Sequence, residues 1–370
     1  MKILQIAIGF EGGIGKLLVD YCTRMNDCIE FEFLVGIYEN GRYENELKKC
    51  GFTIHHILVG ASKEEKEIVL NNILKNDHFD AVHIHGVCDY IFLKCAKRNK
   101  VKTRIVHSHN ASVETRHKNP LYKICRNIYR GFNNWLYVTD KWACGIEAGK
   151  ALWGEAAVKS NRVFIMPNAV QTENYAFDES IRRAVRSKLE IDQDAIVVGS
   201  VGRLTYQKNQ SFMIGVLSEI KKTSDKVYLV MIGDGEQEEE LKHKAIECGV
   251  DKNIKWLGNR NDVPQLLNAM DVFILTSHFE GLPVVMIEAQ ANGLPYVVSD
   301  VVTKECDFLN SNEYLSLTSS FREWADAVLK AAAAGRDQNA ESILIEHGYE
   351  LKAAVEILKN KYKEVIKTNA

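Results

Sequence analysis

The sequence predicts an α/β protein built from two doubly wound parallel sheets. Short apolar runs alternate with stretches of helical periodicity along the whole chain, and this alternation is typical of parallel strands joined by covering helices. The strand candidates fall into two series, separated near residues 167–177 where the periodicity lapses, and 370 residues is a suitable length for two domains. We therefore expect domains at 1–170 and 171–348, followed by a terminal segment at 349–370.

Each strand is expected where a short apolar run is bounded by polar or glycine-containing turns. The runs in the first half lie at 2–8, 31–36, 53–59, 81–84, 104–107 and 162–166. Those in the second half lie at 196–201, 227–232, 254–257, 272–275 and 296–298. The tail at 349–366 has apolar residues at helical spacing, so it is expected to form a helix.

Composition excludes several classes of protein. The net charge is close to zero, with a positive first half and a negative second half, and no dense basic stripe suggests nucleic-acid binding. No run of 18 apolar residues and no signal peptide are seen, which favours a cytoplasmic protein. The nine cysteines are scattered without a Cys-x-x-Cys pair, so reduced thiols are expected rather than disulfides or a zinc site.

The segment 271–295 carries the strongest local signal. A buried strand is expected to end near Thr276, a polar turn with Glu280 follows, and Pro283 suits the first position of a new helix. Ligands of such sheets bind at the carboxyl ends of strands, and a helix N-terminus attracts phosphate. Glu280 could then contact a sugar and Glu288 a ribose, with phosphates between them. The alternative is an ordinary loop acid and a solvated helix acid.

A second segment supplies positive charge. The strand at 196–201 runs into a loop that carries Arg203 and Lys208, and these side chains could neutralise a diphosphate leaving group in place of a metal ion. No Asp-x-Asp motif stands at a strand end, so we expect chemistry without a metal. Ordinary surface charges are the alternative.

Together these motifs resemble the retaining GT-B glycosyltransferases of family 4, which include bacterial exopolysaccharide and capsular enzymes. The resemblance rests on Glu280-x7-Glu288, on the Gly-Arg-Leu…Lys-Asn loop at 202–209 and on the Asp-Val…Glu-Gly-Leu-Pro stretch at 271–283. It implies two Rossmann-like domains facing a cleft, with the donor nucleotide on the C-terminal domain and the acceptor on the N-terminal domain. It also implies a C-terminal helix that crosses back to the N-terminal domain.

The resemblance assigns roles by position. Glu280 would bind donor sugar hydroxyls, Glu288 the ribose, and Arg203 with Lys208 the diphosphate. The other donor-binding positions that it implies are Gly202, Gly233, Asp234, Gly235, Trp256, Gly258, Asn259, Arg260, Gly281, Leu282, Pro283 and Val284.

A glycine-rich loop follows the first strand and contains Gly12, Gly13 and Gly15. Its spacing does not match a P-loop, and no acid ends the second strand as a dinucleotide fingerprint requires. The resemblance places these glycines against the donor phosphate. The alternative is a tight turn that needs positive φ.

Histidines end another strand of the first half. The resemblance favours His107 near the reacting sugar, with His109 second because its ring is expected on the other face of the strand; Asn110 is a further acceptor-side candidate. A structural histidine is the alternative reading.

Residues 116–132 combine apolar positions at helical spacing with a basic stripe. Such a helix could lie on an anionic bilayer and present a lipid-linked acceptor, or it could pack on the core with a solvated face.

The expected function is transfer of a hexose or N-acetylhexosamine from a UDP-sugar to a glycan or polyprenyl-linked acceptor in surface polysaccharide synthesis, with retention and without metal. The protein would be cytoplasmic, with peripheral contact to the inner face of the membrane as an option. A GDP-sugar donor, a GT-B UDP-sugar epimerase and a nucleotide-sugar-binding module without catalysis are the alternatives. UDP is preferred over GDP on its frequency in the family.

Overall fold

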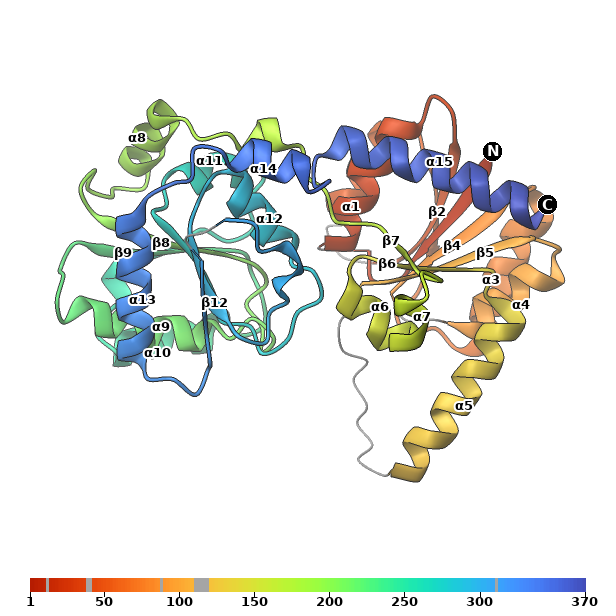
Figure 1. The fold of residues 1–370 in the computed structure, drawn as a ribbon, viewed down its shortest axis with the longest axis horizontal. Coiled ribbons are helices and arrows are strands. Elements are labelled where there is room, and N and C mark those ends of the chain that lie inside the picture. Colours follow the sequence, from red (N-terminus) through yellow and green to blue (C-terminus); the bar gives the residue numbers. More distant parts are fainter. Residues whose placement is uncertain (11–12, 38–41, 87–88, 110–119, 310–311) are drawn as a thin grey trace. The chain divides into compact units, whose positions relative to one another are not determined.

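The computed structural model describes residues 1–10, 13–37, 42–86, 89–109, 120–309 and 312–370. These residues form two compact units (Figure 1). Unit 1 comprises Met1–Asn168 together with Leu351–Ala370, and unit 2 comprises Ala169–Glu350.

Unit 1 contains a seven-stranded sheet in the order β3-β2-β1-β4-β5-β6-β7, in which every pair is parallel. Its strands are β1 (Lys2–Ala7), β2 (Glu30–Gly36), β3 (Thr53–Ile57), β4 (Ala81–His85), β5 (Thr103–Ser108), β6 (Asp140–Ala143) and β7 (Phe164–Ile165). The strand order reverses between β1 and β4, which is the place where ligands bind in doubly wound sheets.

The helices of unit 1 cover this sheet (Figure 1). They are α1 (Gly13–Cys22), α2 (Arg42–Lys49), α3 (Lys63–Asn76), α4 (Tyr90–Arg98), α5 (Pro120–Tyr137), α6 (Ile146–Trp153), α7 (Glu155–Lys159) and the C-terminal α15 (Leu351–Asn369). Helix α15 buries Leu358, Tyr362 and Val365 at helical spacing. No helix among the described residues has the length and apolar character needed to cross a bilayer.

Unit 2 repeats the architecture with a six-stranded parallel sheet in the order β10-β9-β8-β11-β12-β13. Its strands are β8 (Ile196–Val201), β9 (Val227–Ile232), β10 (Ile254–Trp256), β11 (Val272–Leu275), β12 (Tyr296–Ser299) and β13 (Glu313–Leu315). Its helices are α8 (Glu179–Lys188), α9 (Gln210–Lys221), α10 (Glu238–Glu247), α11 (Val263–Asn268), α12 (Val284–Ala291), α13 (Phe321–Ala334) and α14 (Ala340–Glu346). The strand order reverses between β8 and β11.

A buried ion pair holds the start of β11. Asp271 accepts hydrogen bonds from Arg182 (2.5 Å), from the fully buried Arg186 (2.7 Å) and from the backbone N–H of Val197 (2.7 Å). Arg186 also donates to the carbonyls of Ala269 and Ala195, so its buried guanidinium is both paired and hydrogen-bonded. Asp271 therefore serves the fold, and it fixes β11 beside β8.

The predicted fold class is confirmed, and β8, β9 and β11 span the predicted residues. Two strands were not predicted. Strand β6 reads Asp-Lys-Trp-Ala and β13 reads Glu-Tyr-Leu, so neither has the continuous apolar run from which a buried strand is recognised.

Candidate active site

The loops after β8 and β11 lie side by side at the carboxyl edge of the unit 2 sheet. The backbone N–H of His278 donates to the carbonyl of Gln207 (2.8 Å), and the side-chain amide of Gln207 donates to the carbonyl of Phe279 (3.0 Å). The hydroxyl of Thr276 donates to the carbonyl of Asn209 (2.8 Å). Because the strand order reverses between these strands, the paired loops stand where such a sheet receives its ligand.

These loops bring Lys208 and Glu280 into direct contact. The Lys208 Nζ lies 2.7 Å from Oε1 of Glu280, and the hydroxyl of Ser277 donates to the same oxygen at 2.6 Å. Glu280 is buried, with 9 % of its surface exposed, and a buried carboxylate needs such partners. In this structure two of the predicted site residues therefore satisfy one another.

Arg203 stands on the same loop and is exposed. Its carbonyl accepts a hydrogen bond from the side-chain amide of the buried Gln210 (2.8 Å), which fixes the backbone. Among the described residues, no ion pair of its guanidinium is recorded. A fixed backbone with an exposed guanidinium is the arrangement needed to meet a phosphate.

Gly233 and Gly235 let the loop after β9 lie against the loop after β8. A Cβ on Gly233 would stand 2.1 Å from the carbonyl oxygen of Gly202, and one on Gly235 would stand 2.3 Å from that of Leu204. The exposed Asp234 between them accepts from the backbone N–H of Leu204 through its carbonyl (2.8 Å). Both glycines are thus required by a close backbone approach, and this approach positions the loop that carries Arg203.

The loop after β10 joins the same edge. The carbonyl of Gly258 accepts from the backbone N–H of Gly233 (2.8 Å), Trp256 is partly buried, and Asn259 is exposed. The Arg260 guanidinium makes two hydrogen bonds to Asp262 (2.7 and 2.6 Å), which hold the pKa of the Asp262 carboxyl below its usual range. Arg260 is therefore engaged by a neighbouring acid.

Helix α12 begins one residue later than predicted. Pro283 occupies the N-cap position with extended backbone, and no side chain of the described residues caps the helix. The preceding Leu282 is buried, while Gly281 and Val284 are partly buried. Glu288 lies on α12, and its buried carboxylate accepts a hydrogen bond from the hydroxyl of Tyr175 at 2.7 Å.

In unit 1, Gly13 and Gly15 lie in the first turn of α1, whereas Gly12 and Asn110 lie outside the described residues. Gly13 is exposed and Gly15 is buried. A Cβ on Gly15 would stand 2.1 Å from the carbonyl oxygen of Phe10 and 2.6 Å from the ring of Tyr43. Close packing accounts for Gly15, and neither glycine appears among the residues with positive φ.

His83 and His85 of β4, His107 of β5 and His109, which follows β5, form one cluster. The ring centroids lie 4.1 Å apart for His107 and His109, 4.1 Å apart for His83 and His85, and 5.2 Å apart for His85 and His109. The expectation that His109 faces away from His107 is wrong, because alternate residues of a strand project from the same face. His107 has no exposed surface, and neither of its ring nitrogens has a hydrogen-bond partner among the residues that the structure describes. His109 follows the strand end and is partly exposed.

Burial keeps these imidazoles uncharged. It lowers the pKa values of His83, His85 and His107 well below the ordinary value, and it lowers that of His109 to about 4. All four rings are neutral near pH 7, so they act there as hydrogen-bonding groups and not as cations.

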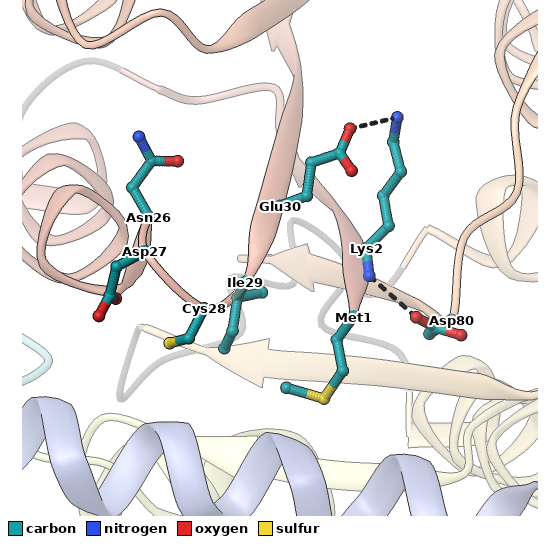
Figure 2. A pocket seen from close by; sticks show the side chains of 8 residues that line it. All are labelled: Met1, Lys2, Asn26, Asp27, Cys28, Ile29, Glu30 and Asp80. Carbon is teal, nitrogen blue, oxygen red and sulfur yellow. Dashed lines mark hydrogen bonds and ion pairs between the residues drawn. The ribbon is translucent and has the colours of Figure 1, made fainter.

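A pocket in unit 1 lies at the opposite edge of the sheet, where β1 and β2 begin (Figure 2). Across it, Lys2 donates through its backbone N–H to Asp80 (2.9 Å) and pairs through Nζ with Glu30 (2.7 Å). Its position at the amino ends of the strands separates it from the candidate site. It is lined by Met1, Lys2, Asn26, Asp27, Cys28, Ile29, Glu30 and Asp80.

Several residues that contact the predicted site residues were not expected from the sequence. Tyr175 and Ser277 orient the two glutamates, and Gln5 and Tyr362 bond the histidine cluster. Ser277 stands three positions before Glu280, so local spacing could have suggested it. The others come from distant parts of the chain and leave no local pattern.

The fold is of the GT-B type, as in known glycosyltransferase structures. The chain aligns with structures of Anabaena Alr3699/HepE in complex with UDP at a TM-score of 0.78 and 18% identity, covering 98% of this chain and 100% of that one. It aligns with WaaG, a glycosyltransferase involved in lipopolysaccharide biosynthesis, at a TM-score of 0.66 and 15% identity, covering 96% and 94% of the two chains.

Sequence comparison shows similarity to one family of glycosyltransferases. Residues 181–351 match the model of the glycosyl transferases group 1. The chain is 29% identical to the putative glycosyltransferase EpsF of Bacillus subtilis, covering 98% of this chain and 96% of that protein. It is 27% identical to an Escherichia coli UDP-Gal:alpha-D-GlcNAc-diphosphoundecaprenol alpha-1,3-galactosyltransferase over 82% of this chain and 80% of that one. The chain is thus similar to the glycosyl transferases group 1, over residues 181–351 in the family model and over nearly its whole length in EpsF.

Proposed function

We propose that the protein transfers a hexose or N-acetylhexosamine from a UDP-sugar to a glycan or polyprenyl-linked acceptor in surface polysaccharide synthesis, with retention of the anomeric configuration. The observation that carries the proposal is the contact of Lys208 with Glu280 beside Arg203, at the switch point of the unit 2 sheet. The relatives support the same substrates: HepE binds UDP, and the Escherichia coli enzyme is named for a UDP-sugar donor and a diphosphoundecaprenol acceptor.

In this mechanism the unit 2 edge stabilises the departing UDP. Arg203, Lys208 and the first N–H groups of α12 face the diphosphate, where negative charge grows as the glycosidic bond breaks. Glu280, released from Lys208, accepts hydrogen bonds from sugar hydroxyls, and Glu288 accepts from the ribose beside Tyr175. The acceptor hydroxyl then attacks from the face that the diphosphate leaves, and its proton passes to an oxygen of the departing diphosphate. With these groups supplying the positive charge, the proposal includes no divalent ion.

Helix α5 of unit 1 is proposed to rest on the cytoplasmic face of an anionic bilayer. Ile128, Phe132 and Trp135 recur at helical spacing and are 67%, 59% and 79% exposed. The opposite side of the helix is attached to the unit, since Asn134 accepts from the hydroxyl of Tyr90 (2.8 Å) and Arg130 donates to the carbonyl of Leu152 (2.8 Å). An exposed apolar stripe on an anchored helix suits insertion into a membrane interface.

Single substitutions test the role of the two cations. Arg203→Ala and Lys208→Ala should each lower turnover roughly 100-fold to 1,000-fold, the usual loss for one preorganised charge-stabilising group. Lys226→Ala removes a lysine whose side chain is 58% exposed in the same unit and should leave turnover unchanged. Assays use UDP-sugars with a lipid-linked acceptor, and circular dichroism checks folding. Wild-type turnover in either site variant refutes the assignment.

The same assay separates the rival functions. Without acceptor, a UDP-sugar epimerase converts its substrate and a binding module does nothing, whereas a transferase shows only slow hydrolysis of the donor. Adding EDTA should leave transfer intact, and strict dependence on magnesium or manganese contradicts the proposed charge stabilisation. Replacing UDP-sugars with GDP-sugars tests the nucleotide.

A further inference from the structure

The buried histidine cluster of unit 1 is connected to the C-terminal helix. Parallel register places Gln5 of β1 beside His83 of β4, and His85 of β4 beside His107 of β5. All four project from the face of the sheet that α15 covers (Figure 1). From α15, the 1% exposed Tyr362 reaches this face with its hydroxyl.

A continuous chain of hydrogen bonds runs from that hydroxyl to the strand end. Tyr362 Oη lies 2.6 Å from Nδ1 of His83 and 3.1 Å from Nε2 of Gln5. The other end of the Gln5 amide, Oε1, lies 2.8 Å from Nε2 of His85. Nδ1 of His85 lies 3.0 Å from Nε2 of His109. Three hydrogen bonds thus join Tyr362 of α15 to His109, the residue that follows β5, and the bond to His83 is a branch at the Tyr362 end.

The Gln5 amide gives this chain its direction, because its nitrogen only donates and its oxygen only accepts. The Tyr362 oxygen accepts from Gln5, so the Tyr362 proton goes to His83. His85 donates to Gln5 through Nε2, which leaves Nδ1 of the neutral ring as an acceptor. His109 consequently donates to His85 through Nε2, and its own Nδ1 carries a lone pair.

We propose that Tyr362, acting through Gln5 and His85, is a positioning residue that fixes the tautomer and the ring orientation of His109. In this state the Nδ1 of His109 accepts a hydrogen bond from a hydroxyl of a reacting sugar. This last step rests on the proposed function. Among the described residues, no partner is recorded for Nδ1 of His109, and the lowered pKa of the ring keeps that lone pair available at neutral pH.

Loss of the Tyr362 hydroxyl should reverse the chain. A phenylalanine leaves the Gln5 nitrogen without an acceptor, and a buried N–H group without a partner costs more than an under-satisfied carbonyl. Rotation of the amide by 180° turns the nitrogen toward His85 and the oxygen toward the new ring. His85 then carries its proton on Nδ1 and donates to Nε2 of His109, whose Nδ1 becomes a donor in place of an acceptor.

A metal ion is the other way to use these side chains, since ring nitrogens of His83, His85 and His107 lie within 4.8 Å of one another. Both nitrogens of His85 are already hydrogen-bonded, however, and the group contains no anionic ligand. A divalent charge in this buried place would be uncompensated. The hydrogen-bonded network is the better account, and metal binding is one outcome of the test.

The test is Tyr362→Phe, with Tyr21→Phe as the matched control. Tyr21 is equally buried in unit 1, and it donates to the carbonyl of Pro167 (2.9 Å), which is not part of the chain of hydrogen bonds from Tyr362 to His109. Long-range ¹H–¹⁵N spectra of ¹⁵N-histidine-labelled protein report each tautomer, and His109→Gln assigns the His109 signals. We expect the Nε2–H form of His109 in the wild type and the control, and the Nδ1–H form in Tyr362→Phe. The kcat of Tyr362→Phe should fall at least roughly tenfold, with the KM for UDP-sugar unchanged.

Each outcome decides one part of the proposal. An unchanged His109 tautomer in Tyr362→Phe overturns the positioning role, and so does a stoichiometric metal in the purified wild type. Full activity in His109→Gln overturns the sugar contact of His109 while leaving the tautomer result valid. If Tyr362→Phe does not fold, Gln5→Met interrupts the chain at the next link. That variant should show both tautomers of His109, and a single Nε2–H form contradicts the proposal.

Discussion

At the residue scale, the candidate donor site consists of charges that already have partners or are held in place. Glu280 is bonded to Lys208 and Ser277, Glu288 to Tyr175, and the backbone of Arg203 to Gln210. Such contacts fix side chains before the substrate arrives, so less ordering is required during the reaction. The glutamate that contacts Lys208 should therefore matter for rate through its charge.

Glu280→Gln keeps the shape of the side chain and removes its charge. Turnover should fall roughly 100-fold because strong hydrogen bonds from donor hydroxyls to a carboxylate are lost. Affinity for UDP should change much less, since Lys208 is freed to meet the diphosphate. Steady-state kinetics and calorimetric titration with UDP measure the two effects. Glu239→Gln, with a side chain 81% exposed in the same unit, is the control, and equal losses in kcat and UDP affinity would contradict a sugar-facing role.

At the scale of elements, the strands that have a clear local pattern of apolar residues were predicted from the sequence. Strands buried on both faces are apolar runs, so β8, β9 and β11 were located correctly, and their order brought Arg203, Lys208 and Glu280 to one edge. The ranking of His107 above His109 did not anticipate that His107 is wholly buried. The role of Tyr362 was also hidden, because it meets Gln5 across 357 residues of sequence. Contacts of that kind depend on packing that no local spacing reveals.

The exposed stripe of α5 gives a prediction at the same scale. Phe132→Ser combined with Trp135→Ser should weaken binding to vesicles of anionic phospholipid at least roughly tenfold, since each change removes a large buried apolar contact from the interface. Ile357→Ser, at a 55% exposed position of α15, is the control. Vesicle sedimentation measures the binding. Equal binding by all variants rejects α5 as the contact, and transfer to a water-soluble acceptor should persist in each.

At the scale of the whole molecule, the two units differ in their buried titratable groups. His83, His85, His107 and His109 belong to unit 1 and have lowered pKa values. Their ordinary pKa near 6.5 is recovered on unfolding, so the unfolded chain binds more protons below that pH. The contribution of the neutral rings to the free energy of unfolding of unit 1 is present above pH 6.5 and is lost as the pH falls from 6.5 toward 4. Acid should therefore weaken unit 1 first.

Chemical denaturation at pH 7.5 and pH 5.5 tests this asymmetry. Each wholly buried histidine should lower the free energy of unfolding of unit 1 by up to about 1.4 kcal/mol per pH unit below 6.5. Trp142 reports unit 1 and Trp324 reports unit 2 when the remaining tryptophans are replaced. His107→Leu should reduce the number of protons that unit 1 takes up on unfolding by one, and so reduce the slope of the unfolding free energy against pH. A unit 1 transition that is independent of pH over this range contradicts the account.

The contact between Lys208 and Glu280 also bears on which molecules the site admits. A small anion such as phosphate would only replace the ion pair that Lys208 already forms with the carboxylate of Glu280. Binding of that anion would leave the buried Glu280 without its counterion, which costs free energy. A sugar nucleotide brings a pyrophosphate for the lysine and hydroxyls for the glutamate in one molecule. We therefore expect the resting ion pair to screen the proposed site against abundant inorganic anions and to favour ligands that satisfy both groups at once.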